Sequence, residues 1–199
     1  MKHFTTLLFA LALNIASSET ADPKVLLQEP FSMDLSKDWF WGLGTWKAGN
    51  GILRGFESGP RRHGPVKMRR LVFKDATLEC EFRLEGKATF AGIIFNGSQE
   101  RGHLVMGVKE LRVLVHPDKG ENKELLKIPA ALAVGEWHRV KIEFHGETLT
   151  ATLDGQTISA MHPCIAEEKQ TFGLGGDSGG PQGVKAGALE FRGLRVTQP

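Results

Sequence analysis

Hydrophobic and polar residues alternate along most of the chain that follows Trp46. The clearest case is 76–84, where apolar side chains take every second position and Glu79, Glu81 and Arg83 lie between them. Alternation with a period of two predicts a β-strand that buries one face. The same alternation, or a short apolar run between turn residues, predicts further strands over 51–56, 90–95, 103–108, 111–116, 136–145, 148–153, 156–160, 171–174 and 188–196.

Turn-forming dipeptides separate these segments, among them Asn50-Gly51, Asn96-Gly97 and Asp154-Gly155. Turns that recur about every eight to twelve residues are typical of β-sandwiches and barrels. Helical patterns are confined to 121–126 and 165–169, each long enough for a turn or two. The sequence therefore predicts an all-β fold, a two-sheet antiparallel jelly-roll sandwich.

Residues 1–18 have the form of a secretory signal peptide. Lys2 gives a basic start, 4–13 is almost wholly apolar, and small residues at 16–18 predict cleavage after Ser18. The apolar run is too short to cross a bilayer as a helix, although it could instead be an N-terminal core helix. We expect 19–199 to be a single domain that is exported to the periplasm or the extracellular space.

Composition narrows the class of protein further. The 199 residues include 25 Lys and Arg against 23 Asp and Glu, which gives a net charge of +2. Nucleic-acid-binding proteins need a dense basic surface, and this charge balance provides none. No second long apolar run is present, so we expect neither a nucleic-acid partner nor a membrane partner. The oligomeric state stays open.

The two cysteines allow two interpretations. Export would place Cys80 and Cys164 in an oxidising compartment, where they could form one disulfide. Cys80, however, lies on the apolar phase of its predicted strand, where a lone cysteine behaves as a small buried hydrophobe.

A family resemblance adds to this pattern. The segments that carry it are the tryptophans at 39, 41 and 46, GNGILRG (49–55), FKDATLECEFR (73–83), AGIIF (91–95), GEWH (135–138), LDG (153–155) and LEFRGLRV (189–196). Over roughly 31–197, their order resembles the concanavalin A-like sandwich of the bacterial 3-keto-disaccharide hydrolase domain family. Many laminin G-like and lectin-like sandwiches share these strand and turn residues. The resemblance implies a carbohydrate or glycoside ligand and hydrolysis of 3-keto-glycosides. In that chemistry the 3-keto group acidifies the C2 proton, so a general base and an oxyanion stabiliser suffice.

Several residues could supply these roles. Glu81 or His116 could be the base, and Arg83 or Arg112 the oxyanion stabiliser. Glu79 and Glu81 project from one strand face about 6.6–7 Å apart by strand rise. Their carboxylates could approach the separation of about 5.5 Å found in a retaining glycosidase. The alternative is a solvated strand face on which basic neighbours balance the acids.

The polar strand face of 76–84 could lie on the concave side of the sandwich. Its carboxylates and Arg83 would then converge with Arg112, His116 or Glu143 from neighbouring strands. The loop Arg61-Arg62-His63 could close one rim and bind a sugar hydroxyl, a carboxylate or a sulfate, or it could be a solvated basic turn.

Aromatic side chains offer a further binding surface. Trp39 and Trp41 share a strand phase and could stack together on a sugar ring, although tryptophan is more often buried in a core. No histidine shows the spacing of a zinc site, so we expect no metal and no cofactor. A structural Ca²⁺ among the turn residues Asp118, Asp154 and Asp177 has no ligand spacing to support it.

Three functions follow from these residues. The first is an exported enzyme that cleaves 3-keto-glycosides. The second is a non-catalytic carbohydrate-binding sandwich, which needs only an aromatic platform and a polar rim. The third is a laminin G-like protein-interaction module. A fold alone decides among none of them.

Overall fold

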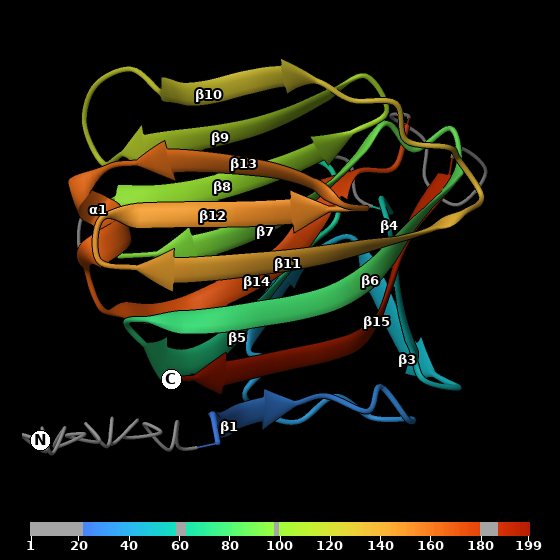
Figure 1. Cartoon of the computed structure of the whole chain (residues 1–199). Coiled ribbons are helices and arrows are strands. Elements are labelled where there is room, and N and C mark those ends of the chain that lie inside the picture. The colour runs from blue at the N-terminus through green and yellow to red at the C-terminus, as the bar shows by residue number, and fades with distance from the viewer. Residues whose placement is uncertain (1–21, 59–62, 98–99, 180–186) are drawn as a thin grey trace, which may run out of the picture.

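The structure is a computed structural model that describes residues 22–58, 63–97, 100–179 and 187–199. The predicted signal peptide lies outside the described residues. The described chain forms two antiparallel sheets that face each other (Figure 1). Its last strand ends beside the start of its first strand, because these two strands pair with each other. The predicted two-sheet antiparallel sandwich is therefore confirmed.

The sheet in front in Figure 1, here called sheet A, has the strand order β13-β12-β11-β6-β15-β4-β3, and β1 pairs with β15. Its strands are β1 (Lys24–Gln28), β3 (Thr45–Gly49), β4 (Ile52–Phe56), β6 (Ala76–Gly86), β11 (Trp137–His145), β12 (Thr148–Leu153), β13 (Gln156–Met161) and β15 (Gly187–Gln198). The long strands β6, β11 and β15 form its centre because each pairs along most of its length.

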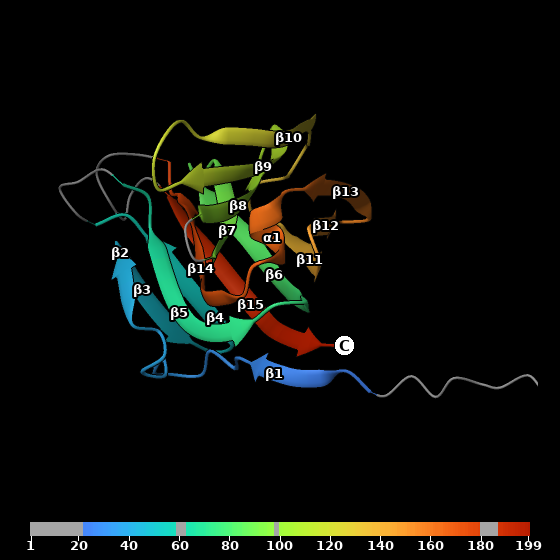
Figure 2. The same ribbon diagram turned by 90° about the vertical axis from the view of Figure 1, so that its left-hand side faces the viewer.

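The second sheet, here called sheet B, has the order β10-β9-β8-β7-β14-β5-β2. Its strands are β2 (Trp41–Leu43), β5 (Val66–Phe73), β7 (Phe90–Asn96), β8 (Glu100–Gly107), β9 (Glu110–Pro117), β10 (Lys123–Pro129) and β14 (Lys169–Asp177). The strands β7 to β10 are consecutive neighbours, whereas β14 arrives from far along the chain and fills the gap between β7 and β5 (Figure 2).

The core lies between the sheets and consists of the inward phase of each strand. On β6, for example, Leu78, Phe82 and Leu84 have no exposed surface. The side chains that the alternation places inside are all buried, and they include Ile93, Phe95, Val140, Ile142, Phe144, Leu153, Phe172, Leu189 and Phe191. The side chains at the other positions of each strand therefore point away from the core, toward solvent or a ligand.

Helix is confined to one turn in the described residues, and one helical prediction is wrong. Segment 121–126 belongs to a loop and to β10, because pairing with the exposed edge of β9 outweighs the helix preference of its Glu, Lys and Leu residues. The pattern at 165–169 corresponds to the single turn α1 (Pro163–Ala166), after which the chain enters β14. No helix in the described ranges is long and apolar enough to cross a membrane.

Both cysteines are buried and neither forms a disulfide. Cys80 points inward from β6, and burial raises the pKa of its thiol to about 12. Cys164 lies in α1, where burial and then the charges of Glu100 and Glu167 raise the pKa of its thiol to about 11. Of the two interpretations of the sequence, the structure selects buried free thiols.

Candidate functional site

The predicted site residues divide between opposite outer faces of the sandwich. Glu79, Glu81 and Arg83 project outward from β6 in sheet A, whereas Arg112 and His116 belong to β9 in sheet B. The expected convergence of the two groups is therefore wrong, because the whole core separates the two outer faces. Among the expected partners, only Glu143 of β11 shares the outer face of sheet A with them.

The outer face of sheet A is covered by paired charges. Arg192 bonds Glu81, and Arg139 lies 3.3 Å from Glu79. Glu79 and Glu81 thus each have a basic neighbour on an adjacent strand, as the solvated-face alternative requires. Lys141, paired opposite Glu79, reaches Glu143 at 2.7 Å.

A second charge cluster on this face is centred on the buried carboxylate of Glu190. Arg54 bonds one of its oxygens, and Arg83 lies 2.6 Å from the other. The guanidinium groups of Arg83 and Arg192 lie 4.8 and 4.0 Å from the ring of Trp137, so this tryptophan is covered by cations. Arg83, a predicted oxyanion stabiliser, thus forms an ion pair with Glu190.

The outer face of sheet B follows from its strand register. Residues paired across successive strands form rows, and the first, here called the apolar row, consists of Trp41, Met68, Gly173, Ile94, His103 and Leu114. The second, the polar row, consists of Arg70, Thr171, Asn96, Arg101 and His116. The third, the glycine row, consists of Val66, Gly175, Gly92, Val105 and Arg112.

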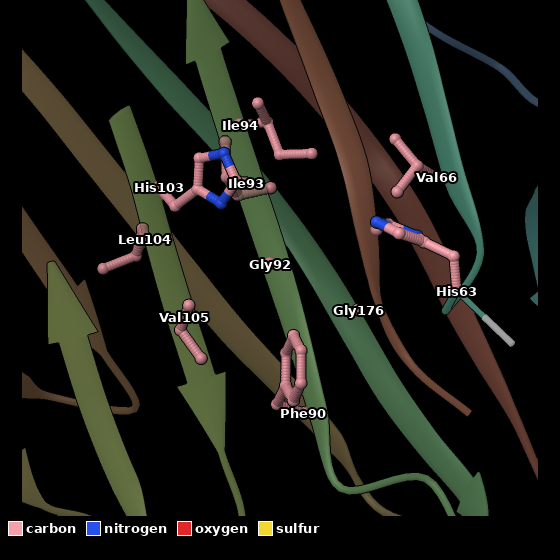
Figure 3. Close-up of a pocket in the computed structure, with 11 residues that line it drawn as sticks. His63, Val66, Phe90, Gly92, Ile93, Ile94, His103, Leu104, Val105 and Gly176 are labelled. Carbon is pink, nitrogen blue, oxygen red and sulfur yellow. The ribbon is translucent and has the colours of Figure 1, made fainter. Parts of the chain in front are cut away.

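A hollow of about 210 Å³ lies over the glycine and apolar rows. Gly92 and Gly175 have no side chains to fill it, while Phe90 and Val105 form part of its wall. Figure 3 shows the rings of His63 and His103 on opposite sides of Gly92. The sheet thus offers a small cavity with an apolar floor and imidazoles at its sides, a common form of small-molecule site.

His103 and His116 form a close pair at the junction of the apolar and polar rows. Their ring centroids lie 4.2 Å apart because the two residues are diagonal neighbours on β8 and β9. Burial, followed by the charges of His116 and Arg101, lowers the pKa of His103 to about 3. His103 is therefore neutral at physiological pH.

Two polar atoms of the polar row are buried without a hydrogen-bond partner among the described residues. They are Nε2 of His116 and Oδ1 of Asn96. The amide nitrogen of Asn96 is satisfied, since it donates to Thr171 at 2.8 Å. Arg101 is paired directly with both Asn96 and His116 in the sheet register. Buried polar atoms normally have partners, so these two are candidates for binding a ligand's polar groups.

Arg112 is the third predicted catalytic residue, and it lies apart from the histidine pair. It belongs to the glycine row and forms ion pairs with Glu110 at 2.9 Å and Glu124 at 3.7 Å. Arg101, which the sequence analysis did not select, lies opposite His116 instead.

The two predicted stacking tryptophans have different environments. Trp39 is buried against Phe31 and Phe172, and its indole nitrogen donates to Glu29 at 3.0 Å. Trp39 precedes the first residue of β2, so it does not share the outward direction of Trp41. Because it is buried, it cannot stack on a sugar ring. Trp41 is 47% exposed on the outer face of sheet B.

The predicted basic loop is only partly described. Arg61 and Arg62 lie outside the described residues. His63 is described and lines the hollow, so this part of the loop does approach the site. Its Nδ1 lies 2.9 Å from the carbonyl oxygen of Gly64.

Two of the turn aspartates considered for Ca²⁺ have other partners. Asp154 instead accepts bonds from His138 and from the backbone of Arg139, and Asp177 accepts from Thr89. Within the described ranges, three potential metal ligands come together only at Glu100, His162 and Cys164.

Comparison with known proteins identifies the family. The model of the 3-keto-alpha-glucoside-1,2-lyase-like domain family matches residues 33–197, so the chain belongs to this family. The family named from the sequence resemblance is confirmed, and the chain carries a 3-keto-glycoside hydrolase-like domain. The chain matches no curated protein sequence.

Solved structures share the fold at low sequence identity. A laminarinase from a Flavobacterium species is 14% identical, with a TM-score of 0.65 over 88% of this chain and 100% of the enzyme. The carbohydrate-binding module CBM66 from Bacillus subtilis is 15% identical, with a TM-score of 0.60 over 78% of this chain and 92% of the module. These likenesses support the concanavalin A-like jelly roll.

Three residues that lie around His116 on sheet B were not selected by the sequence analysis, namely Asn96, Arg101 and His103. A signal was present for two of them, since Arg101 and His103 share the outward phase of one strand. What the sequence could not supply is the neighbourhood of that strand, which brings His116 and Asn96 to its two sides.

Proposed function

We propose that the protein binds a 3-keto-glycoside at the hollow on sheet B and cleaves it by elimination between C1 and C2. The proposal combines the family membership with an outer face on which, among the described residues, buried polar atoms without a partner lie beside a cavity. Hollows of about 500 and 380 Å³ also adjoin sheet A, but the β6 acids that line them are paired with arginines, Glu81 with Arg192 and Glu79 with Arg139.

The proposed base is the histidine pair, with His116 as the member that accepts the proton. His103 is a poor acceptor because its pKa is lowered to about 3. Nε2 of His116 has no partner among the described residues and is shielded from solvent, so the ring has to turn toward the hollow to meet a substrate. This unpartnered nitrogen is the observation that carries the assignment.

Proton removal is feasible because the 3-keto group acidifies C2. The base takes the C2 proton, and the electron pair passes into an enolate whose charge lies on the C3 oxygen. Collapse of the enolate restores the ketone, forms the C1–C2 double bond and breaks the C1–O bond, and the departing oxygen takes up a proton. Arg101, opposite His116, is the proposed stabiliser of the enolate oxygen.

A second candidate is binding without catalysis. It is favoured by the exposure of Trp41 and Phe40, at 47% and 44%, near a hollow that also includes Asn96 and Arg101. Exposed aromatic rings beside polar groups can hold a sugar without any reaction. This candidate uses the same face of sheet B, so the two differ in chemistry and not in place.

The test is incubation of the purified protein with ordinary glycosides and with the corresponding 3-keto-glycosides, followed by product analysis. We expect release of the alcohol from the 3-keto compounds only, together with an unsaturated keto-sugar that lacks the C2 hydrogen. Saturable binding without product would favour the binding candidate. Neither binding nor turnover of either class would contradict both.

Export is a separate part of the proposal and rests on the signal-peptide pattern of residues 1–18. Mass measurement of protein recovered from the periplasm or medium should give an N-terminus near Glu19. A main species that begins at Met1 would contradict it.

A further inference from the structure

A group of three chemically different side chains lies where α1 meets the start of β8, one residue along β8 from Arg101. Glu100 begins β8, His162 is the N-cap of α1, and Cys164 lies in the first turn of that helix. The turn α1 packs against β8 and β11, so residues distant in sequence meet at this point.

The ligand atoms of this trio are already close together. One imidazole nitrogen, the thiol sulfur and a carboxylate oxygen all lie within 4.8 Å of one another. Nδ1 of His162 is 3.4 Å from an oxygen of Glu100. Ligand atoms around a tetrahedral Zn²⁺ lie about 3.3–3.8 Å apart, as follows from bond lengths of about 2.0–2.3 Å. Small side-chain movements would therefore bring all three into coordination distance.

We propose that Glu100, His162 and Cys164 form a binding site for a borderline-soft divalent cation of the Zn²⁺ type. A thiolate and an imidazole select such a cation over Ca²⁺ and Mg²⁺, which prefer oxygen ligands. One thiolate and one carboxylate balance its two positive charges, so the cation is bound without excess charge. The side chains are also shielded, with Cys164 2% exposed and the other two side chains 15% and 21% exposed.

Two existing contacts have to be compatible with this site. The backbone N–H of Cys164 donates to Nδ1 of His162 across 3.3 Å, a long bond that the cation would replace. The ammonium group of Lys169 lies near enough to interact electrostatically with the Cys164 thiol, and it donates to the carbonyl oxygens of Lys74 and Ile165, so it does not take up the ligand atoms of the trio.

The bound cation would tie α1 to the start of β8. Because the unfolded chain does not bring these residues together, binding stabilises the folded state by mass action. The site shares no residue with the hollow on sheet B, so its occupancy can be measured independently of turnover.

The experiment is a Co²⁺ titration of the reduced, chelator-treated protein, followed by the near-ultraviolet sulfur-to-metal charge-transfer band. We expect a band that saturates at one equivalent and disappears when Zn²⁺ is added in excess. Cys164→Ser should abolish the band, while Glu100→Gln and His162→Gln should weaken Co²⁺ binding at least tenfold.

The matched control is Cys80→Ala, which removes the other buried thiol and should leave the band unchanged. Circular dichroism of each variant establishes that it is folded, and Glu100→Gln tests the site without altering the cysteine. No band in the wild-type protein, or a band that survives Cys164→Ser, would overturn the proposal.

Discussion

The central strands of the two outer faces differ in whether their polar residues have partners. On sheet A, Glu79, Glu81 and Glu190 each have an arginine partner, and the half-buried ring of Trp137 lies beneath two guanidinium groups. On sheet B, His116 and Asn96 have buried polar atoms without partners in the described part of the chain. Mutual neutralisation suits a solvated surface, whereas unsatisfied polar atoms beside a hollow suit a ligand.

The difference arises from strand neighbours and not from residue type. Both faces contain aromatic, basic and acidic side chains on the outward phase of long strands. On sheet A, the register sets acids opposite bases, as at Glu81 and Arg192. On sheet B, it sets glycines next to one another, as at Gly92 and Gly175, and the hollow follows.

The strongest test of the comparison is one substitution on each face. His116→Gln should lower turnover of a 3-keto-glycoside at least 100-fold, since general-base catalysis contributes about 10²–10⁴-fold. Glu81→Gln breaks a partly exposed ion pair and should change turnover less than twofold. Steady-state kinetics on both variants gives the measurement. A loss at Glu81 that matches or exceeds the loss at His116 would restore Glu81 as the base and move the site to sheet A.

The second test measures how the free energy of unfolding falls as the pH is lowered. His103 has a pKa lowered from 6.5 to about 3, so its protonated form is disfavoured in the fold. Stability attributable to this group is full above the unfolded pKa of 6.5 and is lost as the pH falls toward 3. Allowing for solvent screening, we expect a loss of about 2 kcal/mol between pH 6.5 and about pH 4.

His103→Leu should remove this acid sensitivity in urea unfolding measured at both pH values. The control is His145→Gln, a change at an exposed histidine that ends β11 in sheet A, and it should leave the pH dependence as in the wild type. An identical pH dependence in wild type and His103→Leu would show that His103 titrates normally in the fold.

The third test fills the hollow. In Gly92→Val the new Cβ would lie 3.3 Å from the carbonyl oxygen of Leu104, tight but tolerable, and the side chain would occupy the floor. We expect roughly a tenfold loss of kcat/KM, about 1.4 kcal/mol, with the fold retained. Thr150→Val adds a valine on the outer face of sheet A and should have no effect. Unchanged kinetics in Gly92→Val would place the substrate elsewhere.

Much of the fold can be predicted from the sequence, because the alternation of apolar and polar residues within each strand shows which of its side chains are buried. The strand 76–84 is the plainest example, since every apolar position in it is buried. Segment 121–126 is the opposite case. Its residues favour helix, and only the free edge of β9 makes it a strand, which local propensity cannot predict.

The candidate site was less predictable for the same physical reason. His116 was selected from its own strand, but its partners His103, Asn96 and Arg101 are set by pairing between strands. Alternation also predicted a shared phase for Trp39 and Trp41, yet the chain before Trp41 is irregular and turns Trp39 into the core. The alternation within a strand shows which of its side chains are buried and which are exposed. Which exposed side chains of different strands meet on one face depends on the order of the strands in the sheet.

The smallest expected effect comes from a pair of tryptophans, one on each face. Trp41 is 47% exposed in the apolar row, and stacking of a sugar ring on it would contribute about 1 kcal/mol, so Trp41→Ala should weaken glycoside binding about fivefold. Trp137→Ala is the matched control, because that ring is already covered by Arg83 and Arg192. Isothermal titration with a non-reactive glycoside measures both. If Trp137→Ala weakens binding and Trp41→Ala does not, the sugar binds on sheet A, and the charged face would then have to open its ion pairs to admit it. If only Trp41→Ala weakens binding, the sugar extends along the apolar row from Trp41 toward His103, which joins the aromatic edge of sheet B to the proposed base.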